Sequence, residues 1–338
     1  MSVEEMSATA KALFRDGKGL LAMDESNPTC NKRFEKLGIP QTEEYRQKWR
    51  QLIVTAPGLS ESISGAILYD ETIWQKSSDD IPFITILQKN GIVPGIKVDA
   101  GAKDFAGHPG EKSTEGLDGL RERLTTYFNF GARFAKWRAV ITIGPSIPSI
   151  ACIDANVTEL TLYALLCQEA GLVPIVEPEV LMDGDHTMEK CREVTVQVQN
   201  ALFEKLTEYG VALEALILKP NMILPGLNCQ IQETVDETAE ATIATLLRTV
   251  PAKVPAVAFL SGGQSAEHAT ARLAAMNTKY GERVPWAVAF SYSRAIQQKA
   301  LEIWRGEDSN IAEAQRSLIF YASSNRQARL GREAPAVS

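Results

Sequence analysis

Short apolar runs recur along the chain, and a helical pattern of apolar positions separates each run from the next. Many runs are rich in β-branched residues, and two of the helical patterns end at Gly210 and Val250. Parallel strands that are covered by helices on both faces have this near-continuous apolar character. The runs begin at Gly19, Gly65, Ile92, Arg133, Leu172, Glu214, Ala256 and Trp286. Eight strand–helix repeats predict an α/β fold, the closed (β/α)8 TIM barrel, with an open doubly wound sheet as the alternative.

The length of the chain fits one such barrel. It has 338 residues, and barrels of this kind occupy roughly 200 to 400 residues. The sequence contains no Pro/Gly/Ser-rich linker and no low-complexity segment. We therefore expect a single catalytic domain over residues 1–338, with an N-terminal helix in "MSVEEMSATAKALF" and a short C-terminal tail from about residue 332 to 338.

Each apolar run ends in a polar residue. In a barrel, the carboxyl ends of all strands meet at one opening, which is where active sites are built. Every strand must end in something polar, but three lysines and a Glu-Pro-Glu are unusual choices for the start of an ordinary loop. The strand-ending residues are Asp24, Asp70, Lys97, Lys136, Glu177, Lys219, Ser261 and Ser291.

The alternation of strand side chains places several of these charges on one face. Residues two apart in a strand share a face, so Lys136 and Arg138 point one way and Trp137 points the other way. Glu177 and Glu179 share a face in the same manner. If Lys219 also faces the barrel interior, cations and carboxylates of three neighbouring strands, about 4.8 Å apart, meet there.

Composition narrows the class of partner. The net charge is −7 and the pI is about 5.3, and no basic tail or Lys/Arg block predicts a nucleic-acid partner. No apolar run approaches the roughly 20 residues of a membrane helix, and the N-terminus lacks the layout of a signal peptide. The five cysteines are interpreted as reduced packing thiols of a cytoplasmic protein.

The lysine at the end of the sixth run suggests covalent chemistry. A lysine amine is protonated at neutral pH, and burial beside a second cation favours its nucleophilic form. Lys136 is the available cation for Lys219. The amine then attacks a ketone to form a Schiff base, Glu177 shuttles protons as water leaves, and the imine accepts electrons from a breaking carbon–carbon bond. No cofactor is required.

A metal-dependent route is not predicted. The chain has three histidines, and none of them lies at ligand spacing to another. "GDH" at 184–186 is interpreted as a turn before a helix.

The last two strands predict a phosphate site. A glycine pair, Gly262 and Gly263, follows Ser261 between a strand and a helix, where backbone N–H groups can bind an anion. Arg294 follows the eighth strand. Lys97 and Arg33 are predicted to form a second cationic group across the opening, so the pattern suits a substrate with phosphate at both ends.

Long motifs now connect these residues to a known family. They are "KGLLAMDES", "GIKVD", "FAKWR", "GLVPIVEPE", "LKPNM", "FLSGGQS" and "FSYSRA". The sequence resembles the class I fructose-1,6-bisphosphate aldolases from near its start to about Gly331. The resemblance implies reversible aldol cleavage of fructose 1,6-bisphosphate, in glycolysis or gluconeogenesis, to dihydroxyacetone phosphate and glyceraldehyde 3-phosphate, by a metal-independent homotetramer.

The resemblance also implies roles for individual residues. Lys219 would form the Schiff base and Glu177 would shuttle protons, while Glu177 or Asp24 would take the proton from the C4 hydroxyl. Lys136 would be the neighbouring cation, and Arg138 and Glu179 would hold the carboxylates. Ser261, Gly262, Gly263 and Arg294 would bind the phosphate of dihydroxyacetone phosphate, and Ser26, Arg33 and Lys97 would face the other phosphate.

Three departures from the family pattern stand out. Ala100 replaces the lysine of "VDKG", and Ser293 replaces a glycine that is common in animal members. Animal and plant members also end in a tyrosine that moves the enamine proton, whereas the last tyrosine here is Tyr321. The carrier of that proton is therefore unassigned.

Rival functions are a lyase acting mainly on sedoheptulose 1,7-bisphosphate, a pyridoxal-phosphate enzyme, and a binding protein built on an inactive barrel. The first would use the same site. The second would colour the purified protein, and the third would require the loss of a catalytic residue.

Overall fold

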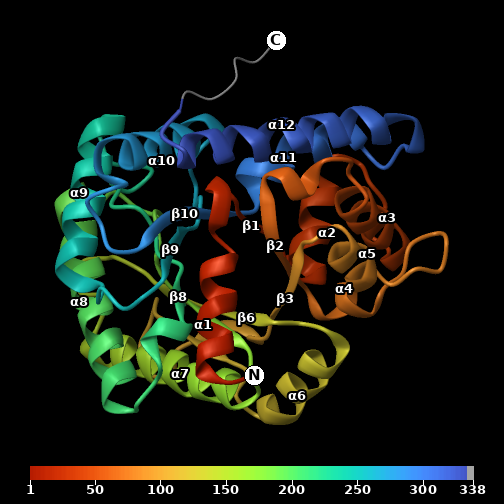
Figure 1. Cartoon of the computed structure of the whole chain (residues 1–338). Helices are drawn as coiled ribbons and strands as arrows, with labels where there is room; N and C mark the ends of the chain where they lie inside the picture. Colours follow the sequence, from red (N-terminus) through yellow and green to blue (C-terminus); the bar gives the residue numbers. More distant parts are fainter. Residues whose placement is uncertain (333–338) are drawn as a thin grey trace.

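The computed structural model describes residues 1–332, and eight of its strands form a closed parallel barrel (Figure 1). The barrel closes because β1 pairs with both β2 and β10. The predicted (β/α)8 barrel is therefore confirmed, and the open sheet is excluded. The strands in barrel order are β1 (Gly19–Met23), β10 (Ala287–Tyr292), β9 (Ala256–Phe259), β8 (Ile217–Leu218), β7 (Val173–Val180), β6 (Phe134–Ile141), β3 (Val93–Lys97) and β2 (Ile63–Leu68).

Helices surround the barrel in Figure 1. Several begin with a serine or threonine whose side chain accepts a hydrogen bond from the first turn, as Thr234 does for α9. The helices are α1 (Val3–Ala12), α2 (Asn27–Glu35), α3 (Glu43–Val54), α4 (Asp70–Trp74), α5 (Phe83–Lys89), α6 (Leu120–Phe130), α7 (Ile150–Glu169), α8 (Met188–Glu208), α9 (Val235–Thr249), α10 (Ala266–Tyr280), α11 (Arg294–Trp304) and α12 (Ile311–Arg329).

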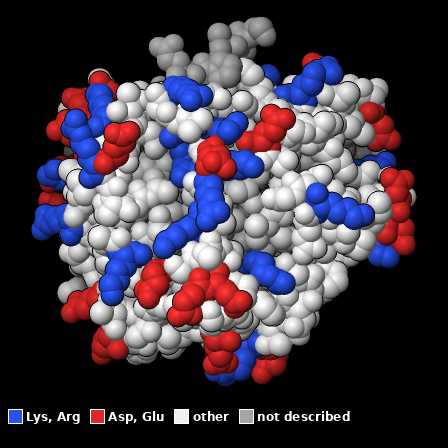
Figure 2. Space-filling view, in the orientation of Figure 1, with Lys and Arg blue, Asp and Glu red and all other residues white. Residues whose placement is uncertain are grey.

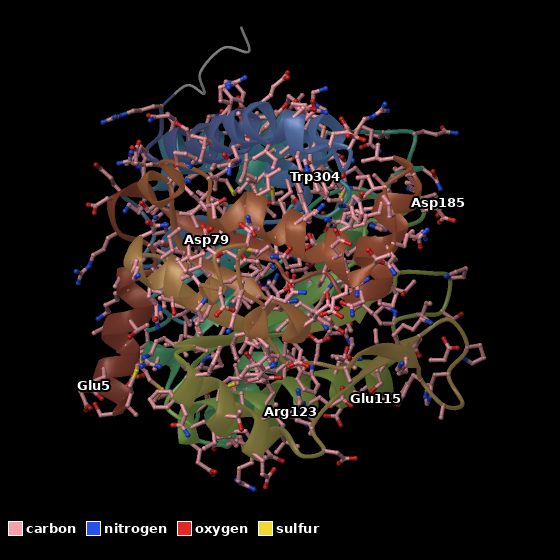
Figure 3. The ribbon with its side chains drawn as sticks, turned by 90° about the vertical axis from the view of Figure 1, so that its right-hand side faces the viewer. Glu5, Asp79, Glu115, Arg123, Asp185 and Trp304 are labelled. Carbon is pink, nitrogen blue, oxygen red and sulfur yellow. The ribbon has the colours of Figure 1, made fainter. Side chains whose placement is uncertain are left out.

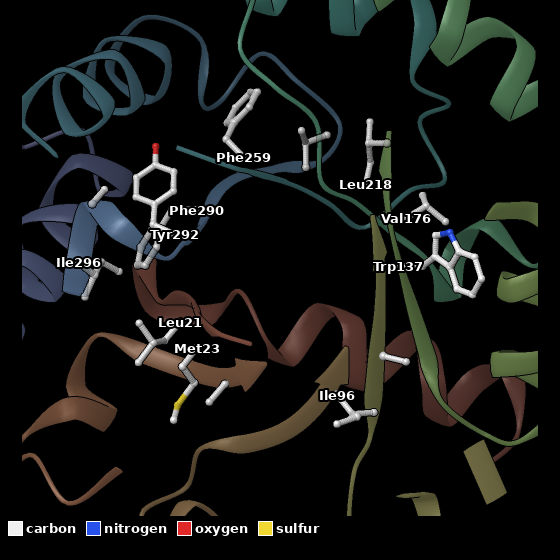
Figure 4. Close-up of a cluster of buried hydrophobic side chains, with 14 of the residues drawn as sticks. Leu21, Met23, Ile96, Trp137, Val176, Leu218, Phe259, Phe290, Tyr292 and Ile296 are labelled. Carbon is white, nitrogen blue, oxygen red and sulfur yellow. The ribbon is translucent and has the colours of Figure 1, made fainter. Parts of the chain in front are cut away.

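Alternate strand residues build two separate apolar cores. Outward side chains such as Leu21, Trp137 and Phe259 pack under the helices (Figure 4). Inward side chains such as Phe134 and Ile175 fill the barrel. The predicted opposition of Trp137 to Lys136 and Arg138 is confirmed, because Trp137 packs beside Tyr163 of α7 with ring centroids 5.5 Å apart.

Helix α1 covers the amino-terminal end of the barrel. Met6, Ala10 and Leu13 belong to the same apolar cluster as the inward side chains of the strands. Seen from the side, Glu5 of α1 lies on one flank, and Glu115 and Asp185 lie on the opposite flank (Figure 3). On the face that carries α1, basic and acidic side chains are interspersed (Figure 2). The other end of the barrel, where the strands finish, is the one available for a site.

The structure differs from the predicted elements at three places. Strands β6 and β7 continue to Ile141 and Val180, past Lys136 and Glu177, which were predicted to end them. The sixth barrel strand, β8, has only two residues, because Leu213–Ala215 form a 3-10 turn before it. A two-stranded hairpin, β4 (Gly101–Asp104) and β5 (Lys112–Glu115), follows β3 and was not predicted. Its strands are short and polar, so they lack the apolar pattern that predicts a strand.

Helix α7 contradicts the expectation that no apolar run approaches the length of a membrane helix. This helix has 20 residues and is apolar enough to pass a test of length and composition for a membrane span. Half of its apolar window is buried in the protein, and it contacts β6 and β7. Such packing is typical of a barrel helix.

Part of the predicted tail, residues 333–338, lies outside the described residues. All five cysteines are free, and four of them are buried, as expected for packing thiols.

Candidate active site

A cavity of about 1200 Å³ opens at the carboxyl ends of the barrel strands. Its lining includes every predicted site residue except Gly263, which follows Gly262 in the same turn. Asp70 does not line it: this residue begins α4, and its carboxylate accepts a hydrogen bond from Tyr127 at 2.6 Å. The predicted residues in the lining are Asp24, Ser26, Arg33, Lys97, Lys136, Arg138, Glu177, Glu179, Lys219, Ser261, Gly262 and Arg294.

Four charged side chains form the floor of this cavity. Lys136 Nζ lies 2.7 Å from Asp24 Oδ2 and 3.2 Å from Glu177 Oε2. Lys219 Nζ lies 3.2 Å from the other oxygen of the same carboxylate, Glu177 Oε1. All four residues are buried. Glu177 lies between the two lysines, with one carboxylate oxygen near each.

The electrostatics favour the ionised forms of three of these groups, Lys136, Asp24 and Glu177. Burial opposes charge on each group, but Asp24 and Glu177 together raise the pKa of Lys136. In return, Lys136 and Lys219 outweigh burial and lower the pKa values of both carboxyl groups. Because these folded-state pKa values lie below the ordinary ones, both carboxylates are charged at neutral pH. Their contribution to stability disappears only as the pH falls through the lowered values.

A second ion pair extends the floor toward the opening. Arg138 Nε bonds Glu179 Oε2 at 2.5 Å. The backbone N–H of Arg138 donates to Asp99 Oδ2 at 3.2 Å, and Asp99 Oδ1 lies 2.6 Å from Lys97 Nζ. Asp99 thus connects the end of β3 to the middle of β6.

Arg33 of α2 lies beside the residues that follow β10. Its guanidinium bonds Glu25 Oε1 at 2.6 Å and lies 3.5 Å from the hydroxyl of Ser293, which immediately precedes Arg294. Burial and the nearby Arg33 both lower the pKa of Arg294. Arg33 therefore lies close to Ser293 and Arg294, and its grouping with Lys97 stays a prediction, because both residues line the same cavity. Closure of β1 onto β10 brings the segment after β1 beside the segment after β10.

The glycine turn adjoins the same end. Gly262 has a φ of 53°, in the left-handed region that glycine tolerates best. Arg294 Nη2 donates to the carbonyl of Gly262 at 3.2 Å. Elsewhere on the wall, the hydroxyls of Ser26 and Thr29 lie 3.1 Å apart.

Sequence reasoning missed several residues of this site. Glu25 is bonded by both Arg33 and the fully buried Arg50, and an arginine within an amphipathic helix carries no signal that it is buried. The contacts of Asp99 with Lys97 and with the backbone of Arg138 were also not predicted. Ser291 was noted only as a strand end; its buried hydroxyl lines the cavity without a hydrogen-bond partner among the described residues.

Residues 1–332 contain no cluster of side chains that is suited to bind a metal ion. No group of three His, Cys, Asp or Glu side chains there has an arrangement suited to a metal ion.

Comparison with known proteins gives a consistent result. The family model for fructose-bisphosphate aldolase class-I matches residues 5–337. A probable fructose-bisphosphate aldolase class 1 of Xanthomonas campestris is 52% identical over 333 residues, which cover 98% of this chain and 99% of that protein. Cytosolic fructose-bisphosphate aldolase 5 of Arabidopsis thaliana is 47% identical over 329 residues, or 97% of this chain and 91% of that one.

A solved structure agrees with these relatives. Fructose-bisphosphate aldolase of Plasmodium falciparum, crystallised with TRAP and a small-molecule inhibitor, superposes with a TM-score of 0.96 at 43% identity and covers 99% of this chain and 96% of its own. With a matching family model, matching relatives and a matching barrel, the chain belongs to the class I fructose-bisphosphate aldolase family.

Proposed function

We propose that the protein cleaves fructose 1,6-bisphosphate reversibly through a Schiff base on Lys219. The observation that carries this proposal is the shared carboxylate of Glu177, with Lys219 at 3.2 Å on one oxygen and Lys136 at 3.2 Å on the other. This places a nucleophile and a cation each 3.2 Å from one acid–base group in a buried site.

The first half of the reaction joins enzyme and substrate. Glu177 Oε1 accepts a proton from Lys219, whose amine then attacks the C2 ketone to give a carbinolamine. Glu177 returns a proton to the C2 hydroxyl, which leaves as water while the C2–N double bond forms. Lys136 is charged before the reaction begins, because Asp24 and Glu177 raise its pKa.

The second half breaks the carbon–carbon bond. Glu177 or Asp24 takes the proton from the C4 hydroxyl, the C3–C4 electron pair moves into the iminium, and glyceraldehyde 3-phosphate departs. The remaining enamine takes a proton at C3, and hydrolysis releases dihydroxyacetone phosphate. Arg138 and Glu179 hold the surrounding carboxylates through their ion pair.

Two groups of residues are proposed to bind the two phosphates. Arg294, Arg33 and the Ser261–Gly263 turn would bind the phosphate of dihydroxyacetone phosphate, since Arg294 contacts the turn and Arg33 approaches Ser293. Lys97 and Ser26 would bind the other phosphate. This arrangement retains the sequence-based scheme but moves Arg33 to the Arg294 side.

The two phosphate groups predict different mutant behaviour. Arg294→Ala is expected to weaken the binding of both dihydroxyacetone phosphate and the bisphosphate. Lys97→Ala is expected to weaken the binding of the bisphosphate alone. Loss of one charge-assisted contact corresponds to about 10- to 150-fold in affinity. Values of KM in the cleavage and condensation directions measure both effects. Equal effects of the two variants on both ligands would contradict the two-site arrangement.

Activity is expected to survive removal of divalent metal. The electron sink in this scheme is the protonated imine, so no Lewis acid is required. Cleavage rates should agree within about twofold with and without excess EDTA. Activity that vanishes with EDTA and returns with zinc would contradict the Schiff-base scheme.

Sedoheptulose 1,7-bisphosphate is a second candidate substrate, because a cavity of about 1200 Å³ leaves room for one more carbon. Turnover of the two bisphosphates side by side, with chelator present, distinguishes the preferences. Family resemblance further supports a role in glycolysis or gluconeogenesis and a homotetramer, and relatives named as cytosolic support a cytoplasmic location. The chemistry requires no pyridoxal phosphate, and the intact charged floor favours an enzyme over a binding protein.

A further inference from the structure

Ser293 occupies an unusual position between a buried carboxylate and the two arginines at one end of the cavity. We propose that Ser293 is a positioning residue, which acts with Glu25 to hold Arg33 toward the phosphate of dihydroxyacetone phosphate. This inference rests on the phosphate site proposed above for Arg294.

The contacts of Glu25 define the arrangement. The hydroxyl of Ser293 donates to Glu25 Oε1 at 2.5 Å, and Arg33 Nη1 donates to the same oxygen at 2.6 Å. The other oxygen, Oε2, is held by Arg50 at 2.6 Å. The side chains of Glu25 and Arg50 are only 5% and 2% exposed. The buried Arg50 therefore holds the carboxylate through the oxygen that Ser293 and Arg33 do not contact.

Arg33 is held at more than one point. Both Nη1 and Nη2 lie 3.5 Å from the Ser293 hydroxyl oxygen, in addition to the short bond from Nη1 to Glu25. The side chain of Arg33 is 21% exposed, so it stands at the cavity wall with part of its surface accessible. A guanidinium that is held on one edge presents its other donors in a restricted direction.

The start of helix α11 supports the same interpretation. Serine at a helix N-cap normally accepts a hydrogen bond from a first-turn N–H, but Ser293 makes no such bond. Its hydroxyl is turned to Glu25 instead. The uncapped first turn of α11 contains Arg294 and Ala295, and both line the cavity. Glu25 therefore orients Arg33 and also leaves the helix N-terminus open to an anion.

Removal of the hydroxyl is expected to loosen Arg33 without removing any charge. Holding a long side chain ready for its ligand is worth about 3- to 10-fold in affinity. The loss should appear in binding at the Arg294 end, because Arg33 approaches that end, and should be absent for glyceraldehyde 3-phosphate at the Lys97 end.

The test compares Ser293→Ala with Ser293→Thr, which retains a hydroxyl. Condensation kinetics give KM for each triose phosphate, and inorganic phosphate serves as an inhibitor competing with dihydroxyacetone phosphate. For Ser293→Ala we expect KM for dihydroxyacetone phosphate and the phosphate inhibition constant to rise about 3- to 10-fold. We expect kcat and KM for glyceraldehyde 3-phosphate to change less than about twofold, and Ser293→Thr to restore the wild-type values. A simple loss of stability would not produce this split.

A double-mutant cycle tests whether Ser293 acts through Arg33. In an Arg33→Ala background, Ser293→Ala should add less than about twofold to KM for dihydroxyacetone phosphate. A full effect in that background, an equal effect on both triose phosphates, or no effect of Ser293→Ala would overturn the inference.

Arg294→Ala in the same assays distinguishes an error in the proposed phosphate site from an error in the role of Ser293. If it leaves KM for dihydroxyacetone phosphate unchanged, the proposed phosphate site is wrong and this inference falls with it. If Arg294→Ala raises that KM and Ser293→Ala does not, only the role of Ser293 is wrong.

Discussion

Replacing Lys219 by arginine is expected to reduce cleavage by about 10⁴-fold or more. Arginine keeps the positive charge beside Glu177, but its guanidinium stays protonated and does not add to a ketone. The substitution thus tests nucleophilicity separately from charge. Initial rates of triose phosphate formation measure the effect, and thermal unfolding checks that the buried site tolerates the larger side chain.

Borohydride trapping identifies the covalent residue independently of rates. Reduction of the wild-type protein in the presence of substrate should leave one stable adduct, which peptide mass mapping should place on Lys219. Lys32→Arg is the matched control, because Lys32 lines the outer part of the same cavity and should retain full activity and trapping. An adduct on Lys136 or Lys97 would overturn the assignment of the nucleophile.

Glu177→Gln is expected to lower the cleavage rate by about 10²- to 10⁴-fold. Glutamine retains the shape of the side chain but does not carry a proton from Lys219 to the departing water. Formation of the imine should slow along with bond cleavage, so borohydride trapping measured over time should show a smaller initial rate. KM should change less, since Glu177 is not assigned to either phosphate.

The neighbouring carboxylate provides a control for Glu177. Glu179→Gln removes a carboxylate from the same strand face, but Glu179 bonds Arg138 and neither lysine, so its effect on the rate should be smaller. Glu177→Gln also leaves two lysines with less compensating charge, and the unfolding temperature of each variant must be compared. If the two variants lose activity equally at equal stability, Glu177 is not the proton carrier.

The barrel could be predicted from sequence because its strands are buried on both faces and separated by helices. The alternation of side chains along a strand also predicted that Trp137 points away from Lys136, because successive residues lie on opposite faces of the sheet. The hairpin β4–β5 was missed because its polar residues are held by partners distant in sequence, such as Glu159, which bonds Ser113 at 2.8 Å.

The floor of the site was predictable and its Arg294 end was not. Lys136 and Glu177 lie within β6 and β7, and Lys219 directly follows β8. These three strands are neighbours in the barrel, so the proximity of the three side chains follows from strand order. Arg33 lies on a helix, and its direction depends on which strands flank β1 after closure. The partnership of Glu25 with Arg50 depends on how α3 packs, which local patterns do not reveal.

The helix that covers the amino-terminal end of the barrel also constrains how the chain folds. Met6, Ala10 and Leu13 share a core with Phe134, Val173 and Ile217, which are separated from them by more than a third of the sequence. The first helix to emerge during synthesis therefore has no complete docking surface until β8 exists, and β1 lacks one neighbour until β10 is made. Contacts between residues this far apart in sequence slow folding. The apolar faces of α1 and β1 therefore stay exposed until β10 pairs with β1 and completes the barrel.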